Sequence, residues 1–408
     1  MSVATVQLGK LATVIGGYAF KSRDFVEQGV PVVKIANVTW NGVDLGDSSF
    51  LPDEFLSIKD KFHVNCGDVL ISLTGSQLSQ PNSVVGRVAR YTYDTTALLN
   101  QRVGKLIPHD ERKCDIRFVY YFLKQGTVTY QLAINAKGSA NQANISGKDI
   151  EWLRVPDFAI EQQHNVVSIL SAYDDLIENN RRRIQLLEQA ARLLYKEWFV
   201  HLRFPGHEHV KIIDGVPEGW EIMPLGNIVA TNVESYKARE LPNEINYIDI
   251  SSVTEGRIIT KNAVSSNDAP GRARRKAKSG DVIWSNVRPN LRAYALILEP
   301  DENDVFSTGF TVLSPVAVPF SYLYVLVTTD EFVGHLVNHA TGVSYPAVRP
   351  DDFERAVVWV PSPQVLELFH EKTEPILRLI SVLEEEAKPL TEARDLLLPR
   401  LMNGEITV

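Results

Sequence analysis

The amino-acid sequence predicts an α+β protein in which two similar mixed α/β domains are separated by two long helices. The helices are expected to pair as an antiparallel coiled coil in a pseudo-twofold arrangement. Apolar residues recur with heptad spacing from about Glu161 to Val200 and again from Phe369 to Leu401, as in helices that pack along each other. Short motifs also occur twice, once before each helical stretch. The expected order is a domain over residues 1–157, a helix over 158–204, a domain over 205–361 and a helix over 362–408.

The first domain is expected to be a curved sheet covered by helices. Runs rich in β-branched residues, from Val30 to Val38 and from Val69 to Leu73, are bounded by Gly, Pro and Asn and predict strands. The stretch from Arg117 to Tyr130 carries Tyr, Phe and Leu at helical spacing and predicts a helix. Its aromatic residues are expected to be mostly core residues rather than a platform for stacked bases.

The first long helix is expected to begin after Val155-Pro156-Asp157 and to end at Phe204-Pro205-Gly206, because a Pro-Gly pair cannot continue a helix. About forty helical residues span about 60 Å. The expected seam is Val166, Leu170, Tyr173, Ile177, Asn180, Ile184, Leu187, Ala191, Leu194 and Trp198. Asn180 is its one side-chain amide, which either fixes the register at a cost in stability or faces solvent where the helices diverge.

The second domain is expected to repeat the first. Leu8-Gly9 is echoed by Leu225-Gly226, Ile35–Thr39 by Ile250–Thr254, Gly67–Ser72 by Gly280–Ser285, and Gly138 by Gly342. Strands are therefore predicted from Ile245 to Val253 and from Val282 to Trp284, and a helix from Phe320 to Asn338. A repeat of this length indicates a duplicated domain rather than a solenoid, whose units have about 20 to 50 residues.

The second long helix is expected to begin at Ser362-Pro363, a capping residue followed by proline at the first helical position, and to end at Asn403-Gly404. Pro375 and Pro389 lie inside it and are expected to kink or split it. Its expected seam is Phe369, Thr373, Ile376, Ile380, Leu383, Ala387, Leu390, Arg394, Leu397 and Leu401.

Composition indicates a globular protein of the cytoplasm. The chain of 408 residues is 44% hydrophobic, but it has no apolar run long enough for a membrane span, and its first residues lack the pattern of a signal peptide. Cys66 and Cys114 are too few for a disulfide framework and are expected to be structural. The net charge of -8 argues against a protein that binds nucleic acid unaided.

The familiar motifs of catalysis and cofactor binding are absent from the sequence. It contains no phosphate-binding loop, no dinucleotide fingerprint, no His-Glu-x-x-His and no Cys-x-x-Cys. His201, His207 and His209 cluster without the spacing of a standard zinc site, and an exposed loop is the expected alternative. We therefore expect no catalytic residue, no metal and no cofactor in this chain.

Four groups of residues resemble a known family. They are Gly17-Tyr-Ala-Phe-Lys-Ser-Arg-Asp-Phe25, the two Gly-Asp-Val-x-x-Ser motifs, Leu194-Tyr-Lys-Glu-Trp-Phe-Val-His-Leu-Arg-Phe-Pro-Gly206, and Ala393-Arg-Asp-Leu-Leu-Leu-Pro-Arg-Leu-Met-Asn-Gly-Glu-Ile406. Together with the duplication, they resemble the specificity subunit of type I restriction–modification systems. The resemblance covers essentially the whole chain. It implies two target recognition domains that each read one half of a bipartite, asymmetric DNA sequence, with the paired helices setting the spacer between the halves.

The resemblance also implies partners. Two modification subunits would bind this chain, carry S-adenosylmethionine and methylate adenine in double-stranded DNA, and restriction subunits could join them for cleavage that needs ATP and Mg²⁺. The chain itself would be noncatalytic, and it lacks the Asn/Asp-Pro-Pro-Tyr/Phe motif of such adenine methylases. A protein-binding coiled-coil adaptor and a stand-alone methylase or nuclease are the alternatives; the two diverged polar loop regions argue against the first and the missing motifs against the second.

Candidate DNA-binding residues lie in polar loops that follow the repeated strands. Asn and Gln can read adenine and Arg can read guanine in the major groove, although an ordinary turn remains the alternative for each residue. The first set is Ser72, Thr74, Ser76 and Gln77, with Ser285, Asn286, Arg288 and Arg292 in the second domain. The second set is drawn from two Gly-containing loops: Lys137, Asn141, Gln142 and Asn144, and Ser344, Tyr345 and Arg349.

Two basic clusters add further candidates. The strongest is Arg272, Arg274, Arg275, Lys276 and Lys278, for which we expect phosphate contacts. Arg181, Arg182 and Arg183 lie in the middle of the first helix and point to different sides of it. They could contact a modification subunit, contact the phosphates of the spacer, or simply be solvated.

Overall fold

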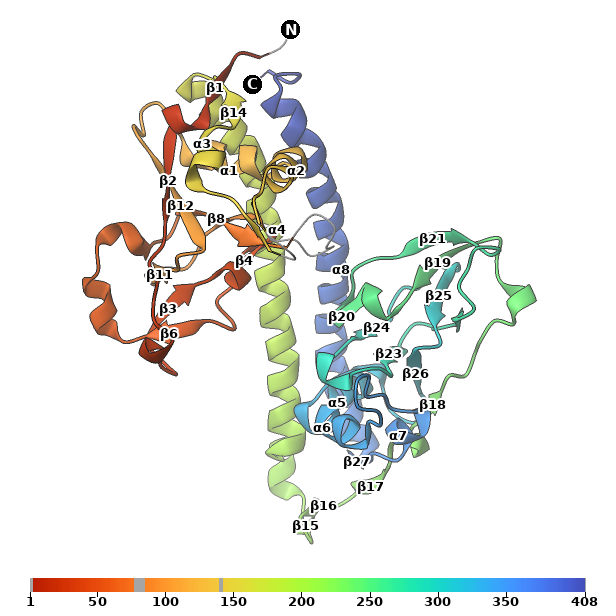
Figure 1. Cartoon of the computed structure of the whole chain (residues 1–408). Helices are drawn as coiled ribbons and strands as arrows, with labels where there is room; N and C mark the ends of the chain where they lie inside the picture. The colour runs from red at the N-terminus through yellow and green to blue at the C-terminus, as the bar shows by residue number, and fades with distance from the viewer. Residues whose placement is uncertain (1–2, 77–84, 139–141, 408) are drawn as a thin grey trace. The chain divides into compact units, whose positions relative to one another are not determined.

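The computed structural model describes residues 3–76, 85–138 and 142–407, and within this part of the chain no helix has the length and apolar character needed to cross a membrane (Figure 1). The chain forms two compact units. Unit 1 comprises residues 1–178 and 387–408, and unit 2 comprises residues 179–386. Each of the two long helices, α4 (Ile160–Tyr195) and α8 (Pro363–Met402), therefore contributes one segment to each unit.

Unit 1 contains two four-stranded sheets, with strand orders β10-β8-β12-β2 and β6-β3-β11-β7, and three pairs of short strands. The strands are β1 (Thr5–Gln7), β2 (Ala12–Gly16), β3 (Val30–Val33), β4 (Val38–Thr39), β5 (Gly42–Val43), β6 (Ser49–Leu51), β7 (His63–Val64), β8 (Val69–Ser72), β9 (Thr74–Gly75), β10 (Val88–Arg90), β11 (Ala97–Leu99), β12 (Val103–Pro108), β13 (Ala143–Asn144) and β14 (Arg154–Pro156). The short helices are α1 (Ile116–Lys124), α2 (Gly126–Ile134) and α3 (Gly147–Glu151).

Unit 2 contains a five-stranded sheet of order β18-β26-β23-β24-β20 and a four-stranded sheet of order β21-β19-β25-β22. The strands are β15 (Ile212–Ile213), β16 (Val216–Pro217), β17 (Glu221–Pro224), β18 (Val229–Thr231), β19 (Glu244–Ile248), β20 (Val253–Ile258), β21 (Asn262–Ser265), β22 (Ala273–Arg275), β23 (Val282–Ser285), β24 (Tyr294–Leu296), β25 (Asp304–Ser307), β26 (Phe310–Pro315) and β27 (Val357–Val360). The short helices are α5 (Phe320–Val327), α6 (Asp330–His339) and α7 (Pro350–Glu354).

The two units share one topology, which confirms the predicted pair of homologous mixed α/β domains. The order β10-β8-β12-β2 corresponds to β24-β23-β26-β18, and β6-β3-β11-β7 corresponds to β21-β19-β25-β22. Within the second sheet of each unit one central pair, β3 with β11 or β19 with β25, is parallel. The repeated strands β8 and β23 lie at matching places, so the sequence repeats mark equivalent positions in space.

The repeated Leu-Gly motif has a packing explanation in both units. Leu8 and Leu225 are fully buried. A Cβ atom on Gly9 would lie 3.0 Å from Cβ of Glu151, and one on Gly226 would lie 3.1 Å from Cβ of Glu354. The glycines thus allow the backbone to approach the short helices α3 and α7, whose glutamates accept hydrogen bonds from the hydroxyls of Thr13 and Thr231. These motifs build the domain and do not form a site.

Several predicted elements are shorter than expected because the chain turns inside them. The predicted strand from Val30 to Val38 is β3, a 3-10 turn at Ile35–Asn37, and β4; in unit 2 the turn is Ile250–Ser252. Polar side chains stabilise these turns: Oδ1 of Asn37 accepts from the Lys34 N–H, and Oδ1 of Asp249 accepts from the Ser252 N–H. The predicted single helices over 117–130 and 320–338 are also wrong, since each is a pair, α1 with α2 and α5 with α6. Their aromatic residues are mostly buried, as expected.

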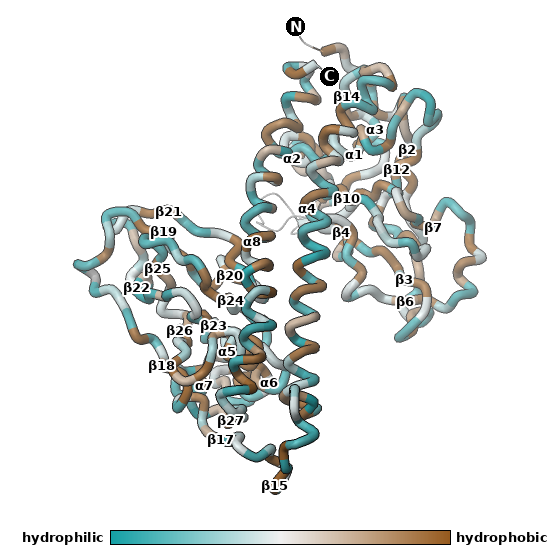
Figure 2. Tube along the Cα trace, turned by 180° about the vertical axis from the view of Figure 1, so that it is seen from behind, coloured by the Kyte–Doolittle hydropathy of each residue, from teal (hydrophilic) through white to brown (hydrophobic). Residues whose placement is uncertain are grey.

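The coiled-coil prediction is confirmed within each unit. In unit 1, Nη1 of Arg394 donates to Oδ1 of Asp174 at 2.8 Å, and the start of α4 shares a hydrophobic core with the end of α8. In unit 2, Nδ2 of Asn180 lies 3.4 Å from Oε2 of Glu386, and the rings of Phe199 and Phe369 are 4.8 Å apart. As the residue number rises along the first helix, the residue number of its contact on α8 falls. The two helices are therefore antiparallel. Figure 2 shows apolar positions recurring along both.

The seam residues are buried or half-buried as the heptads predict. On α4 these include Leu170, Tyr173, Ile177, Asn180, Ile184, Leu187 and Leu194, and on α8 Ile376, Ile380, Leu383, Leu390 and Leu397. Asn180 is buried, so the alternative in which it faces solvent is wrong. Pro375 and Pro389 do not split α8, which is continuous from Pro363 to Met402. Both prolines are exposed, so the backbone carbonyl groups that lose a helical donor can bind water instead.

Candidate nucleic-acid interface

Two loops that are far apart in the sequence lie together in unit 2. One is the segment 285–292 after β23, and the other is the segment 341–349 between α6 and α7. The N–H of Arg288 donates to the carbonyl oxygen of Pro346 at 2.7 Å, and the N–H of Val348 donates to that of Asn286 at 2.8 Å. Gly342 has φ +106°, a conformation that favours glycine. The hydrogen bonds join the two loops into one surface.

Unit 1 repeats this arrangement. Strands β9 and β13 pair, Oγ1 of Thr74 donates to Oδ1 of Asn144 at 2.8 Å, and the N–H of Ile145 donates to the carbonyl oxygen of Leu73 at 2.9 Å. A Cβ atom on Gly138 would lie 1.8 Å from the carbonyl oxygen of Gln142, so only glycine allows this close approach. The loop pair is therefore a property of the duplicated fold, and the side chains it carries differ between the copies.

A third segment, to which no sequence motif pointed, joins the loop pair in each unit. In unit 1 the N–H of Leu73 donates to the carbonyl oxygen of Arg102 at 2.9 Å, and in unit 2 the N–H of Asn286 donates to that of Gly309 at 2.8 Å. These acceptors lie in the turns between β11 and β12 and between β25 and β26. Gln101 and Arg102 are exposed there. The equivalent positions of these two turns in the repeat could have pointed to the segment. The two copies carry different residues there, however.

The candidate residues differ in exposure. Exposed side chains are Lys137, Gln142, Asn144, Arg272, Arg288, Ser344, Tyr345 and Arg349, and half-buried ones are Ser76, Arg274, Arg275, Lys276, Asn286 and Arg292. Gln77 and Asn141 lie outside the described residues. Ser72, Ser285 and Thr74 are buried, with 0%, 0% and 7% of their surface exposed. Burial leaves these three side chains little surface for contact with a base, in contrast to the exposed candidates.

Arg292 is held by acidic side chains rather than presented outward. Its Nη2 donates to Oδ1 of Asp330, and its Nη1 lies 3.8 Å from Oε1 of Glu255. The hydrogen bond to Asp330 raises the pKa of Arg292. Arg292 has a positive φ of +53°. Gly86, which occupies the equivalent position in unit 1, also has a positive φ, +75°. Arg292 therefore fixes the end of the loop, and its contacts with Asp330 and Glu255 leave fewer of its donors for a base.

The basic stretch forms the edge strand β22 and the segment after it. Nη1 of Arg274 donates to the carbonyl oxygen of Ala273, and Nη1 of Arg275 donates to Oγ of Ser235 at 3.1 Å. Burial lowers the pKa of Arg275. Lys276 lies 3.9 Å from a carboxylate oxygen of Glu234. Arg272 alone in this stretch is an exposed arginine without a side-chain partner in the described part of the chain, and its carbonyl oxygen accepts from the N–H of Thr308 in the β25–β26 turn.

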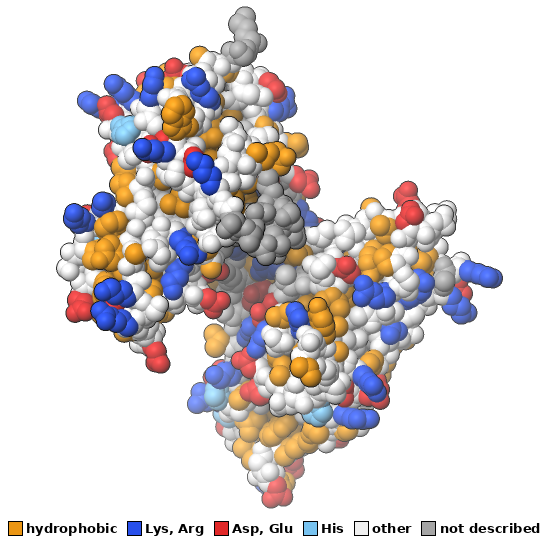
Figure 3. Space-filling model, viewed as in Figure 1, with side chains coloured by type: hydrophobic (Ala, Val, Ile, Leu, Met, Phe, Trp, Pro, Cys, Tyr) orange, Lys and Arg blue, Asp and Glu red, His pale blue; other side chains and the backbone are white. Residues whose placement is uncertain are grey.

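The basic and acidic residues of each unit are interspersed. Figure 3 shows Lys and Arg side chains scattered over the visible face among acidic and hydrophobic ones, without one dominant basic patch. Exposed apolar side chains of unit 2 include Leu291, Val343 and Tyr345, all within the paired loops. Exposed apolar residues beside an arginine suit a surface that is covered when a ligand binds.

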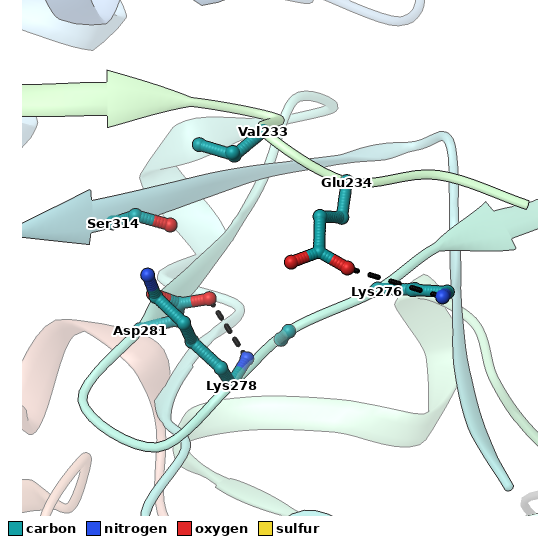
Figure 4. A pocket seen from close by; sticks show the side chains of 7 residues that line it. Val233, Glu234, Lys276, Lys278, Asp281 and Ser314 are labelled. Atoms are coloured by element: carbon teal, nitrogen blue, oxygen red, sulfur yellow. Dashed lines mark hydrogen bonds and ion pairs between the residues drawn. The ribbon is translucent and has the colours of Figure 1, made fainter. Parts of the chain in front are cut away.

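A small cavity of about 110 Å³ adjoins the basic stretch and is lined by Glu234, Lys276, Lys278, Asp281 and Ser314 among others (Figure 4). Oδ2 of Asp281 accepts from the Lys278 N–H at 2.8 Å, but Oδ1 is buried without a partner. Burial raises the pKa of this carboxyl group, and the hydrogen bond from Lys278 offsets the rise only in part. In unit 1 the equivalent Asp68 lies 3.3 Å from the buried ammonium of Lys105.

We expect Asp281→Asn to stabilise unit 2 near neutral pH by about 1 kcal/mol, because it removes a charge whose burial outweighs the favourable contacts with Lys278 and Ser314. A raised folded-state pKa means that stability is lost as pH rises from the unfolded value of 3.8 through the folded one. The gain should therefore disappear in acid, near pH 3. Thermal unfolding between pH 3 and pH 8 measures this.

The matched control is Asp68→Asn in unit 1, which leaves the Lys105 charge buried. We expect this variant to lower the free energy of unfolding by about 2 kcal/mol at neutral pH. If Asp281→Asn raises the free energy of unfolding and Asp68→Asn lowers it, burial of the Asp281 charge is destabilising, as we expect. Equal destabilisation by both would show that Asp281 has a stabilising partner after all.

No metal site is evident in the described ranges, where no group of three or more His, Cys, Asp and Glu residues is suitably placed. His207 and His209 lie 3.3 and 3.8 Å from oxygens of Glu208, and His201 lies 3.9 Å from Glu197. Cys114 is buried, which raises the pKa of its thiol to about 11. Cys66 is exposed.

The chain is similar to proteins of one known family. Residues 2–189 match the family described as type I restriction modification DNA specificity domain. The MjaIX specificity subunit of a type I restriction enzyme from Methanocaldococcus jannaschii is 24% identical over 324 residues, or 76% of this chain and 73% of that protein. The MjaVIII specificity subunit from the same organism is 27% identical over 191 residues, which cover 46% of this chain and 43% of that protein.

A solved structure agrees in fold along the whole chain. The S subunit of a type I restriction–modification system from M. genitalium superposes with a TM-score of 0.61 at 18% identity, covering 98% of this chain and 96% of that one. This similarity establishes the shared fold, with two mixed α/β domains and long central helices. Over residues 2–189 the chain matches the type I restriction modification DNA specificity domain, and it is similar to the specificity subunits of type I restriction–modification systems.

Proposed function

We propose that this chain is a noncatalytic DNA-specificity subunit in which unit 1 and unit 2 each read one half of a bipartite, asymmetric DNA sequence. One observation carries the proposal: the same three-segment loop surface occurs twice, with different side chains. Unit 1 presents Lys137, Gln142, Asn144, Gln101 and Arg102, whereas unit 2 presents Arg288, Ser344, Tyr345 and Arg349, with Arg272 bound to the third segment. Two copies of one scaffold with different hydrogen-bonding groups suit two different half-sites.

The proposal includes protein partners. Two modification subunits would supply S-adenosylmethionine and methylate adenine in double-stranded DNA, and restriction subunits would supply the chemistry that needs ATP and Mg²⁺. Apolar side chains on the outer faces of the helices, such as Leu176, Leu186, Leu193, Val382 and Leu396, are exposed. Their exposure supports docking of these subunits on the helices. Arg182 and Arg183 are also exposed, and contact with a partner, contact with spacer phosphates and solvation all remain open for them.

Two experiments test the function. Copurification with the products of neighbouring genes should recover an adenine methylase. Methylation-sensitive sequencing of the host genome should reveal a split adenine-methylated motif that disappears when this gene is deleted. Recovery of other proteins only, or a motif that persists without the gene, would favour the adaptor alternative.

We expect Arg272→Gln to flatten the salt dependence of DNA binding. Loss of one phosphate contact should reduce the slope of log K against log salt by about one unit. Binding to a fixed duplex between 50 and 200 mM salt measures the slope. The control is Arg203→Gln, which removes a charge that already pairs with Glu197 and should leave the slope unchanged. An unchanged slope in both variants would exclude Arg272 as a phosphate contact.

A further inference from the structure

Arg288 is an exposed arginine whose position is set by the neighbouring loop. Its backbone N–H donates to the carbonyl oxygen of Pro346, and its Nη2 donates to that of Ser344 at 3.2 Å. The guanidinium also lies over the ring of Tyr345, 4.6 Å from the ring centre. Tyr345 is itself 69% exposed. The guanidinium plane is therefore oriented at the surface before any ligand binds.

The backbone at Arg288 is strained. Its φ and ψ are +50° and +63°, and Arg292 at the other end of the turn has +53° and +40°. A residue with a side chain adopts this left-handed conformation at a cost of about 1–2 kcal/mol. The loop-to-loop hydrogen bonds at Pro346 and Ser344 hold Arg288 in place despite that cost. Strain of this kind is concentrated at functional sites.

Arg288 differs from three other candidate arginines of its unit, whose side chains have partners within the protein. The side chains of Arg292, Arg274 and Arg275 donate to Asp330, Ala273 and Ser235. Arg288 has no ion pair within the described ranges, and its one side-chain hydrogen bond goes to a neutral carbonyl oxygen. Four of its five N–H donors therefore remain for a ligand. The guanidinium group is flat, held in place and has no carboxylate partner. Two of its N–H groups can therefore donate to two adjacent acceptors on the edge of a base.

We propose that Arg288 recognises a guanine in the major groove, donating to O6 and N7, so that the half-site read by unit 2 contains a G·C pair at this position. Guanine alone presents two adjacent acceptors on its major-groove edge. A phosphate contact needs neither a stacked ring nor a fixed plane, because it carries no information on the base. Tyr345 is a positioning residue that holds the guanidinium plane. The inference rests on the proposed function and specifies the base class of one half-site.

The test is selection from a randomised duplex DNA library by the full chain, assembled with its modification subunits. Wild type should enrich a split motif in which one half has an invariant G·C pair. Arg288→Ala should relax that single position and lower affinity for the selected site by about 10- to 100-fold, with every other position retained. Tyr345→Ala should weaken the preference at the same base pair by a smaller factor.

Each other outcome is decisive. A split motif that is unchanged in Arg288→Ala, or an affinity loss equal for all sequences, overturns the inference and leaves the proposed function standing. Failure of the wild type to enrich any split motif counts against the proposed function itself. If Arg288→Ala binds no DNA, Arg288→Lys decides: it keeps the charge without the fork, so binding with lost G·C preference supports the inference, and binding with full preference overturns it. Arg203→Gln controls for charge.

Discussion

Replacing Phe369 by alanine is expected to lower the free energy of unfolding of unit 2 by about 3–5 kcal/mol, the usual cost of removing a fully buried aromatic ring. Phe369 lies on α8, is 0% exposed, and contacts the rings of Tyr195, Trp198, Phe199 and Tyr322. The ring therefore joins both long helices to α5 of the domain core. Calorimetry should show the unit 2 transition at a markedly lower temperature, and hydrogen exchange should rise in unit 2 peptides first.

The matched control is the preceding residue. Leu368→Ala changes a side chain that is 38% exposed on the other face of α8, and we expect a loss below about 1 kcal/mol. Similar losses for both variants would mean that the aromatic cluster contributes little beyond ordinary helix packing. A loss confined to Phe369→Ala would identify the cluster as the joint between the helices and the domain.

Burial at the ends of the long helices explains two of the motifs that carried the family resemblance. In the stretch from Leu194 to Gly206, Trp198, Phe199 and Phe204 are buried in the core of unit 2. In the C-terminal stretch, Leu398, Leu401 and Met402 are buried in the core of unit 1. The motifs thus mark where the long helices join the domain cores. They identify the fold reliably but say little about which residues contact a ligand.

Most of the fold was predictable from the sequence because buried residues recur at regular intervals along a helix or strand. Heptads identified both long helices, and repeated strand motifs identified the duplication, since each depends on neighbouring residues in the sequence. Expectations failed where side chains stop an element locally. The hydrogen bond from Lys34 to Asn37 ends β3 early, and Thr329 caps α6 so that α5 and α6 are separate. Each of these caps depends on a single residue within an apolar run, so the pattern of apolar residues does not reveal it.

The candidate site was less predictable because it depends on contacts between distant segments. Sequence spacing could not show that Arg288 meets Tyr345 or that Arg292 meets Asp330. It also could not separate the buried Ser285, whose Oγ donates to the carbonyl oxygen of Val287, from an exposed reader. Burial and partner charge decide which polar residue is available, and both arise from tertiary packing.

Inserting one heptad into both long helices is expected to change the spacer of the recognised DNA sequence and leave both half-sites unchanged. Suitable places are between Glu178 and Asn179 in α4 and between Glu386 and Ala387 in α8, where the two units divide. Seven residues add about 10.5 Å of helix, close to three base pairs, and preserve the phase of the seam. Selection from a randomised library should show a spacer about three base pairs longer, with binding to the original spacing reduced by about 100-fold or more, because one domain can no longer reach its half-site.

The lengthened site should bind more weakly than the original site binds the wild type. Three base pairs rotate the second half-site by almost a third of a turn, whereas a heptad rotates a helix face by only about 20°, so the DNA must untwist. An insertion in α4 alone should abolish split-site binding, because the seams no longer match. The control is seven Gly and Ser residues between Asp214 and Gly215, in the exposed turn between β15 and β16, which should leave the spacer unaltered. Altered half-site bases at constant spacing would show that the helices do not act as a ruler.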